Sequence, residues 1–172
     1  MSLTPMSVSP VDLSATFRDA MAHVCAPVSV ITTMDGDRPH GTTVSAVMSL
    51  SMDPLLVAVA LAESSACLRH IRAAGTFGVN ILDSAQEDVA MRFATKGDDK
   101  FDAVDWSLSA DVPRITGAAV WTACTLAGVA EGGDHTILIG SVVDVETRAG
   151  AAPLTYHGRR FGTHVPLAEA RR

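Results

Sequence analysis

The sequence predicts a mainly β fold with a few helices, an α+β domain built on a β-barrel. Many short β-prone runs follow one another through tight turns, and only a few segments show the apolar spacing of a helix. The strands do not alternate with helices, and no G-x-G-x-x-G motif follows a strand. A doubly wound parallel sheet therefore fits this chain less well than a barrel decorated by helices.

The expected elements are short and are separated by clear turn signals. In chain order they are a helix from Asp12 or Ser14 to about His23, a strand at 28–34, a strand that begins near Pro39 and enters a hydroxyl-rich run, a strand at 55–61, a helix at 64–74, a strand at 76–82, a helix at 86–94, strands at 118–130 and 136–145, and a short strand at 154–156.

The first helix is predicted from Phe17, Met21 and Val24, because residues three or four apart share one helix face. We expect this face to be buried. Ala26-Pro27 ends the helix, since proline cannot continue it. The V-S-V-I-T-T-M run that follows is β-prone, and Asp35-Gly36-Asp37 has the composition of a hairpin turn, with positive φ easily adopted at Gly36.

Residues 55–61 are apolar at every position, so this strand is expected to be buried on both faces. Met52-Asp53-Pro54 forms the turn before it. The helix at 64–74 is expected to place Cys67, Leu68 and Ile71 on one face and to end at Gly75, which suits the left-handed position after a helix.

The second half of the chain contains one more helix and several strands. The helix at 86–94 should turn three residues inward: Val89, Ala90 and Phe93. Residues 96–105 are charged and contain glycine, which indicates a loop with a short helical turn. Residues 131–134 (E-G-G-D) should form the hairpin loop between the two long strands, and residues 158–160 (G-R-R) a basic turn.

Length and composition indicate one domain. The chain has 172 residues, with a loose tail expected at 1–11, the domain at 12–164 and a second tail at 165–172. Hydrophobic residues make up 48% and charged residues 19%, so disorder is not expected. This apolar content is high for a monomer; a buried subunit interface explains it, and a ligand pocket accounts for part of it.

Charge and cysteine content restrict partners and location. The net charge is −6 and no basic run stands out, which argues against nucleic acid as a partner. No apolar run reaches the roughly 20 residues of a membrane-spanning helix, and the N-terminus does not have the pattern of a secretory signal. Cys25, Cys67 and Cys124 show no disulfide or metal spacing, which favours the cytoplasm.

Two runs of small hydroxyl residues are candidates for ligand binding. Thr42-Thr43-Val44-Ser45, with Ser49 and Ser51 beyond, suits either a half-exposed strand or a wall of N–H groups and hydroxyls along a flat heteroaromatic ring. Glu63-Ser64-Ser65-Ala66 precedes a helix and suits an ordinary N-cap, a phosphate site at the helix N-terminus, or both.

Two further runs contain charged groups. Residues 92–101 are either a solvated loop or a site in which Lys96 or Lys100 contacts a phosphate and Phe101 stacks on an aromatic ring. His135, beside Asp134 in a glycine-rich hairpin, is either simply exposed or adjacent to a second substrate. No nucleophile motif accompanies this pair, and the six histidines show no H-x₃-H grouping, so no metal site is predicted. His70 is expected to be structural.

These runs, taken in order, resemble the flavin reductase family with the FMN-binding split-barrel fold. The resemblance extends from Phe17 to Phe161. Its landmarks are F-R-D-A-M, P-V-S-V-I-T-T, T-T-V-S-A-V-M-S-L-S-M-D-P-L-L-V, S-S-A, F-G-V-N-I-L, K-F, G-D-H-T-I-L-I-G-S-V and P-L-T-Y-H-G-R-R-F. Each motif is weak alone, and their order and spacing are fairly specific. Many relatives have Ser-Phe where this chain has Ala46-Val47, which leaves the flavin preference open.

The resemblance implies an NAD(P)H:flavin oxidoreductase. Such an enzyme reduces FMN or FAD with NADH, or sometimes NADPH, and supplies reduced flavin to a separate monooxygenase. It is typically a homodimer. No catalytic side chain is implied, because hydride passes directly between the two rings. The implied flavin contacts are Thr42, Thr43, Val44, Ser45, Ser49, Ser51, Ala60, Glu63, Ser64, Ser65, Ala66, Phe93, Ala94, Lys100 and Phe101, and His135 is the implied contact to the nicotinamide nucleotide.

Two other interpretations of the sequence stay open. A split-barrel protein can bind flavin without turnover, as a flavin carrier or redox sensor. A structural β-barrel dimer with no small ligand is the other interpretation, and the ordered motifs favour it least.

Overall fold

The computed structural model describes residues 10–97 and 99–167, apart from the side chains of residues 10 and 11. Its helices and strands are, in chain order, α1 Pro10–Ala22, β1 Ala26–Pro27, β2 Ser29–Asp35, β3 Arg38–Val44, β4 Val47–Met52, β5 Leu55–Ala62, α2 Ala66–Ala74, β6 Thr76–Ile81, α3 Glu87–Ala94, β7 Trp106–Ser109, β8 Val112–Ile115, β9 Val120–Gly132, β10 His135–Thr147, β11 Leu154–His157 and β12 Arg160–Thr163.

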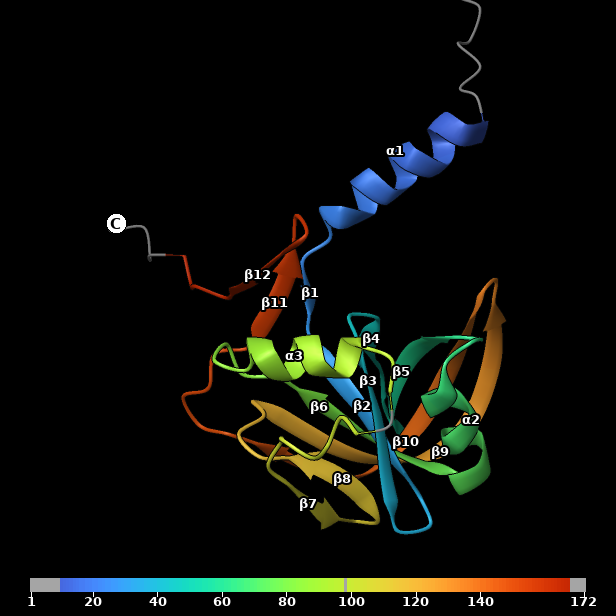
Figure 1. Ribbon diagram of the computed structural model, residues 1–172, viewed down its shortest axis with the longest axis vertical. Helices are drawn as coiled ribbons and strands as arrows, with labels where there is room; N and C mark the ends of the chain where they lie inside the picture. Colours follow the sequence, from blue (N-terminus) through green and yellow to red (C-terminus); the bar gives the residue numbers. More distant parts are fainter. Residues whose placement is uncertain (1–9, 98, 168–172) are drawn as a thin grey trace, which may run out of the picture.

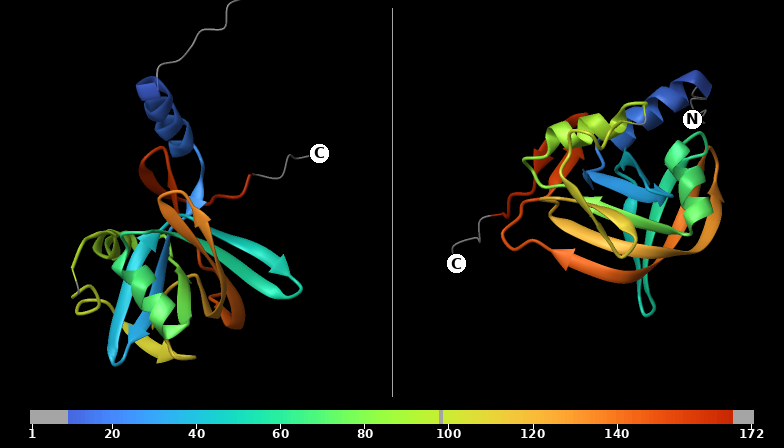
Figure 2. Two further views of the ribbon diagram at one scale, coloured as in Figure 1. Left: turned by 90° about the vertical axis from the view of Figure 1, so that its right-hand side faces the viewer. Right: turned by 60° about the horizontal axis from the view of Figure 1, so that its bottom comes forward.

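Seven antiparallel strands form one curled sheet in the order β3-β2-β6-β9-β10-β5-β4 (Figures 1 and 2). β3 and β4 are its two edges, and they follow each other in the chain. The sheet therefore curls toward closure without pairing its edge strands, which is a split barrel. A three-stranded sheet, β1-β11-β12, and the β7–β8 hairpin complete the domain. The predicted mainly β split-barrel fold is confirmed.

Two buried clusters hold the sheet to the helices. The first lies under α2, whose Cys67, Leu68 and Ile71 face β2 and β6 as the sequence predicts. Gly75 ends this helix with φ of 72°, and its N–H donates to the Ile71 carbonyl. The second cluster lies under α3 and contains Phe93. Both helices are thereby fixed against the strands that carry the hydroxyl-rich run.

Several expectations about the strands need correction. The strand expected from Pro39 onward is two strands, because the chain leaves β3 after Val44 and begins β4 at Val47. The strand at 55–61 is not buried throughout: Leu55 is 52% exposed, since it lies beside the turn of the β4–β5 hairpin, where it pairs with Met52. The sequence analysis also missed β1, β7, β8 and β12, which are only two to four residues long.

The first helix forms, but its apolar face is not buried within this chain. α1 projects away from the body of the molecule in Figure 1. Phe17 is 60% exposed, and Leu13, Met21 and Val24 are exposed as well. Within the described part of the chain, the contacts that attach this helix lie at its C-terminal end: the Gly158 N–H donates to the Ala22 carbonyl, and Arg159 pairs with Asp19 at 2.5 Å. Burial of this face needs another surface.

The expected tails lie mostly outside the described residues. α1 begins at Pro10, two residues before the expected start of the domain, and residues 1–9 and 168–172 are not described. The division into tails and domain stays a prediction. In the described part of the chain, no helix combines the length and apolarity needed to cross a membrane.

Candidate functional site

The hydroxyl-rich run lies along a free sheet edge. β3 is an edge strand that pairs with β2 on one side only. Its other side presents backbone N–H and C=O groups outward from the sheet edge. A cavity of about 320 Å³ lies beside the end of β3, and the chain between β3 and β4 forms part of its wall. Its lining residues are Thr42, Thr43, Val44, Ser45, Ala46, Ala60, Leu61, Ala62, Ser65 and His135.

A second cavity, of about 500 Å³, adjoins the first. Thr42, Ala62 and Ser65 line both cavities, so together they make one groove. The other residues that line the larger cavity come from β3, the start of α2 and the chain after α3: Pro39, His40, Gly41, Ser64, Ala66, Cys67, Ala94, Thr95, Lys96, Gly97, Lys100 and Phe101. We call these two cavities the groove. Their volumes are of the order that small-molecule and cofactor sites have, about 300–1,000 Å³.

The N-terminus of α2 opens into the groove. Ser65 is the N-cap, with φ −69° and ψ 126°, and its hydroxyl makes no capping hydrogen bond to the helix. Ser64 and Ala66 line the same wall. The first N–H groups of a helix have no partner within the helix, and the helix dipole makes this end positive. The arrangement suits an anionic group such as a phosphate.

Lys100 fastens two walls of the groove together. Its Nζ donates to the Gly41 carbonyl on β3 and to the Phe93 carbonyl on α3, each at 3.1 Å. The backbones approach closely here because residue 41 is glycine: a Cβ at this position would lie 2.7 Å from Phe93 Cε1. Phe93 is fully buried and meets Phe101 edge to face, at 4.8 Å between ring centroids.

Thr43 also attaches β3 to α3. Its Oγ1 donates to the Ala90 carbonyl at 2.7 Å. The hydroxyl of Thr43 is therefore engaged within the protein, and the free edge of β3 offers backbone groups for ligand binding beside it.

His135 stands at the opposite side of the smaller cavity. It is the first residue of β10 and pairs with Ala62 of β5. Its Nδ1 lies 2.7 Å from Asp134 Oδ1. The hydrogen bond with His135 holds the pKa of Asp134 below the usual value, so this carboxylate is ionised at neutral pH. The carboxylate fixes the orientation of the imidazole at the mouth of the groove.

Cys67 is the one cysteine among the residues that line the groove. Burial raises the pKa of this thiol to about 12, and its Sγ lies 3.6 Å from the Ile31 carbonyl, to which it donates. It therefore stays protonated at neutral pH and does not supply a thiolate nucleophile.

Four of the expected contacts do not line the groove. Ser49 and Ser51 lie farther along β4, and the Ser51 hydroxyl accepts a hydrogen bond from the Asp53 N–H at 3.3 Å. Glu63 accepts a hydrogen bond from Thr136 and lies 3.6 Å from Arg72. Phe93 is buried behind the wall. The other expected contacts all line the groove.

A third cavity, of about 680 Å³, lies on the other side of residues 43–45. Tyr156 and Phe161 line it as an edge-to-face pair with ring centroids 5.4 Å apart, together with Arg160. A short strand at 154–156 and a basic turn at 158–160 were predicted for this segment, and neither was given a ligand contact. The available signal was the Y-H-G-R-R-F motif, to which no role was given.

Comparisons with known proteins identify the family. The flavin reductase like domain matches residues 21–164. The chain is 39% identical over 158 residues to an NADH:riboflavin 5'-phosphate oxidoreductase of Streptomyces pristinaespiralis, covering 90% of both chains. It is 36% identical over 151 residues to the reductase subunit of a flavin-dependent monooxygenase of Mycobacterium tuberculosis, covering 86% of this chain and 81% of the relative.

A solved structure agrees with these sequence relatives. The NADH:FAD oxidoreductase of Streptomyces globisporus, in complex with NAD and FAD fragments, superposes with a TM-score of 0.87 at 32% identity, covering 95% of this chain and 99% of that one. The order of motifs, the split-barrel sheet and the match over residues 21–164 lead to one conclusion: this chain belongs to the flavin reductase family.

Proposed function

We propose that the groove is where a flavin and a nicotinamide nucleotide meet. The protein is an oxidoreductase that reduces FMN or FAD with NADH and supplies the reduced flavin to a monooxygenase. The isoalloxazine ring lies along residues 42–45, and its phosphate end lies at Ser64, Ser65 and Ala66. The nicotinamide nucleotide enters beside His135. The continuity of the two cavities from the edge of β3 to the start of α2 supports this arrangement.

The protein positions the flavin and the nucleotide and contributes no reacting side chain. When bound, the flavin accepts a hydride from the nicotinamide, and the two rings must approach to about 3–3.5 Å for this transfer. Backbone N–H groups on the free edge of β3 orient the flavin by donating to acceptors on the ring edge. The Ser65 hydroxyl, which makes no capping bond, is available to the phosphate.

Steady-state assays test this function. Purified protein should oxidise NADH only when FMN or FAD is added, and both flavins should be crossed with both NADH and NADPH. Absence of flavin-dependent NADH loss in all four combinations would contradict the proposal. If the protein instead retained a tightly bound flavin without consuming nucleotide, a flavin carrier would be the better description.

Replacing His135 by Ala should weaken binding of the nucleotide more than binding of flavin. Loss of one hydrogen-bonding side chain corresponds to about 1–1.5 kcal/mol, so KM for NADH should rise about 10-fold. Asp134→Asn, which keeps the imidazole and removes only the charge of its 2.7 Å partner, should give a smaller rise. His164→Ala removes an exposed histidine outside the groove and serves as control. Equal changes in the two KM values would remove His135 from this role.

We propose that two copies of the chain associate through the exposed apolar surfaces. α1 presents Leu13, Phe17 and Met21 to solvent, and the β4–β5 hairpin, which extends from the body in Figure 2, presents Met48 and Met52. Large exposed apolar surfaces mark interaction sites. Sedimentation should give twice the chain mass of 17.9 kDa. A single-chain mass at micromolar protein would contradict this.

A cytoplasmic location is the remaining proposal. Cys25, Cys67 and Cys124 are all free thiols, which is the usual state of cysteines in a reducing compartment. Fractionation of cells that express the protein, with activity recovered outside the cytosolic fraction, would contradict it.

A further inference from the structure

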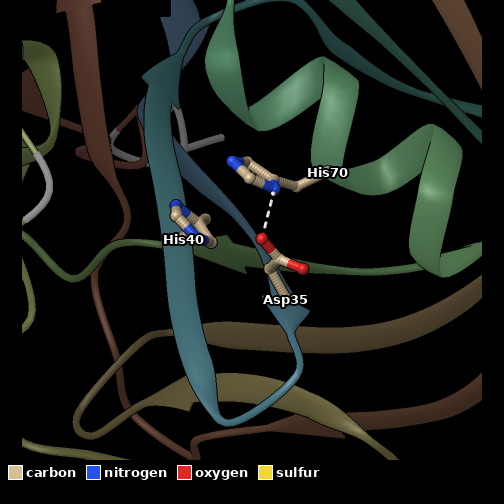
Figure 3. Close-up of side chains that lie close together, drawn as sticks. All are labelled: Asp35, His40 and His70. Carbon is tan, nitrogen blue, oxygen red and sulfur yellow. Dashed lines mark ion pairs between the residues drawn. The ribbon is translucent and has the colours of Figure 1, made fainter.

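Three side chains with metal-binding atoms meet where β2, β3 and α2 come together, beside the larger cavity of the groove (Figure 3). Asp35 is the last residue of β2, His40 lies on β3, and His70 lies in α2. One ligand atom from each residue lies within 4.8 Å of the other two. His70 Nδ1 is 3.2 Å from Asp35 Oδ2, and the imidazoles of His40 and His70 stack with centroids 3.8 Å apart.

The cluster is positioned by regular secondary structure. The Cys67 thiol donates to the Ile31 carbonyl, which seats α2 across β2. His70 is one helical turn after Cys67 and thus lies farther along the same strand, at Asp35. In the β2–β3 ladder, Thr33 pairs with His40, so His40 approaches from the neighbouring strand. Sites built on strands and helices hold their ligands more accurately than sites on loops.

The chemistry of the three donors selects a class of ion. Two imidazole nitrogens and one carboxylate oxygen suit Zn²⁺ and its first-row neighbours, whereas Ca²⁺ and Mg²⁺ prefer oxygen donors alone. We propose that Asp35, His40 and His70 bind one divalent transition-metal ion, with Zn²⁺ as the representative, and leave a fourth position open to water. This site is separate from the transfer of hydride and requires no change of oxidation state at the ion.

Binding requires a modest rearrangement. Metal–nitrogen bonds of about 2.0–2.1 Å place neighbouring ligand atoms of a tetrahedral ion about 3.3–3.4 Å apart. His70 Nδ1 and Asp35 Oδ2, at 3.2 Å, already have about this spacing, so it is the His40 nitrogen that must close in, and one stacked ring must turn so that both lone pairs converge. The terminal torsion of histidine is broad, and the Asp35 side chain is 61% exposed and so is able to follow. The hydrogen bond between Asp35 and His70 is exchanged for the ion.

The three ligands of this site have no local spacing in the sequence that predicts a metal. The ligands are five and thirty residues apart and come from three elements, so no local H-x₃-H or C-x₂-C spacing exists. Only the packing of α2 on the β2–β3 hairpin brings them together. His40 also lines the larger cavity, so a bound ion would additionally fix β3 just before Gly41.

Titration of full-length protein without a polyhistidine tag tests the proposal. Metal-free protein should bind one Co²⁺ per chain, with the visible absorption of a nitrogen and oxygen site and no thiolate charge-transfer band, and Zn²⁺ should displace it. Zn²⁺ should also raise the melting temperature. No saturable binding of either ion at millimolar metal would overturn the proposal.

Substitutions of the three proposed ligands test where the ion binds. His40→Gln and His70→Gln should each weaken binding at least about 10–100-fold, the loss seen even for residues that only orient a metal ligand. Asp35→Asn tests the third ligand at an exposed position, where folding is least at risk. Cys25→Ser and His164→Gln remove an exposed thiol and an exposed imidazole outside the cluster and should leave binding unchanged. Binding that survives in the His40→Gln/His70→Gln double variant would overturn the proposed site.

Discussion

Gly140→Ala is expected to lower the free energy of unfolding by about 2 kcal/mol, although the change adds only one methyl group. Gly140 lies on β10 at a register shift in the β9–β10 ladder. A Cβ there would be 2.4 Å from Phe77 Cζ and 2.9 Å from Cys124 Cβ. Phe77 is fully buried at the centre of the core under α2, so it has little room to withdraw. For a chain of this length, the melting temperature should fall by about 4–8 °C.

Two further variants test whether steric crowding by the new methyl group causes the loss of stability. Gly128→Ala on the neighbouring β9 places its Cβ no closer than 3.9 Å to another residue, so the protein should keep its stability or gain up to about 1 kcal/mol. Phe77→Leu removes the ring atom that the new methyl group would meet. In a double-mutant cycle, Gly140→Ala should therefore cost less in the Phe77→Leu background than in the wild type. Equal costs in both backgrounds would show that Phe77 does not cause the strain.

The sequence alone was sufficient to predict the helices and turns that have strong local signals. α2 is an example, since three apolar residues at helical spacing and a terminal glycine determine its buried face and its end. The hairpin at Gly36 is another, because positive φ, here 57°, marks the turn. Such features depend on neighbouring residues, and they could be read without knowledge of the rest of the fold.

Features that depend on distant contacts could not be read in this way. The apolar face of α1 has the pattern of a buried helix, but nothing in the described residues covers it. The break between β3 and β4 has no glycine or proline signal, and it arises where the chain passes from one edge of the sheet to the other. The strands β7 and β8 are only four residues each, and β8 is attached to β2 by a buried long-range contact, the hydrogen bond from the Thr32 hydroxyl to the Pro113 carbonyl at 2.6 Å.

The candidate site likewise combines features that local sequence predicts with features that depend on distant contacts. Residue types predict a ring edge at residues 42–45 and a phosphate end at Ser64 and Ser65; the fold shows that these residues line one groove, and their roles stay a prediction. The role of Lys100 could not be read from its charge. A lysine near a phosphate site suggests direct contact, whereas the two carbonyls at 3.1 Å show that Lys100 first joins β3 to α3.

Lys100→Met is therefore expected to reduce kcat/KM for every flavin, with or without a phosphate. Loss of the charged hydrogen bonds to Gly41 and Phe93 corresponds to about 1.5–3 kcal/mol, or about 10–100-fold. Because the bonds shape the groove, KM for riboflavin, which has no phosphate, should rise as much as KM for FMN. KM for NADH should change less, since His135 lies at the other end of the groove.

Ser65→Ala provides the matched comparison. Its hydroxyl makes no capping bond, so the melting temperature should not change. If the phosphate lies at the start of α2, KM for FMN should rise about 10-fold, as expected for one lost hydrogen bond, while KM for riboflavin stays constant. The two variants thus separate a residue that builds the groove from one that touches the anion. A rise for FMN alone in Lys100→Met would instead place the ammonium on the phosphate and would reverse the assignment made here.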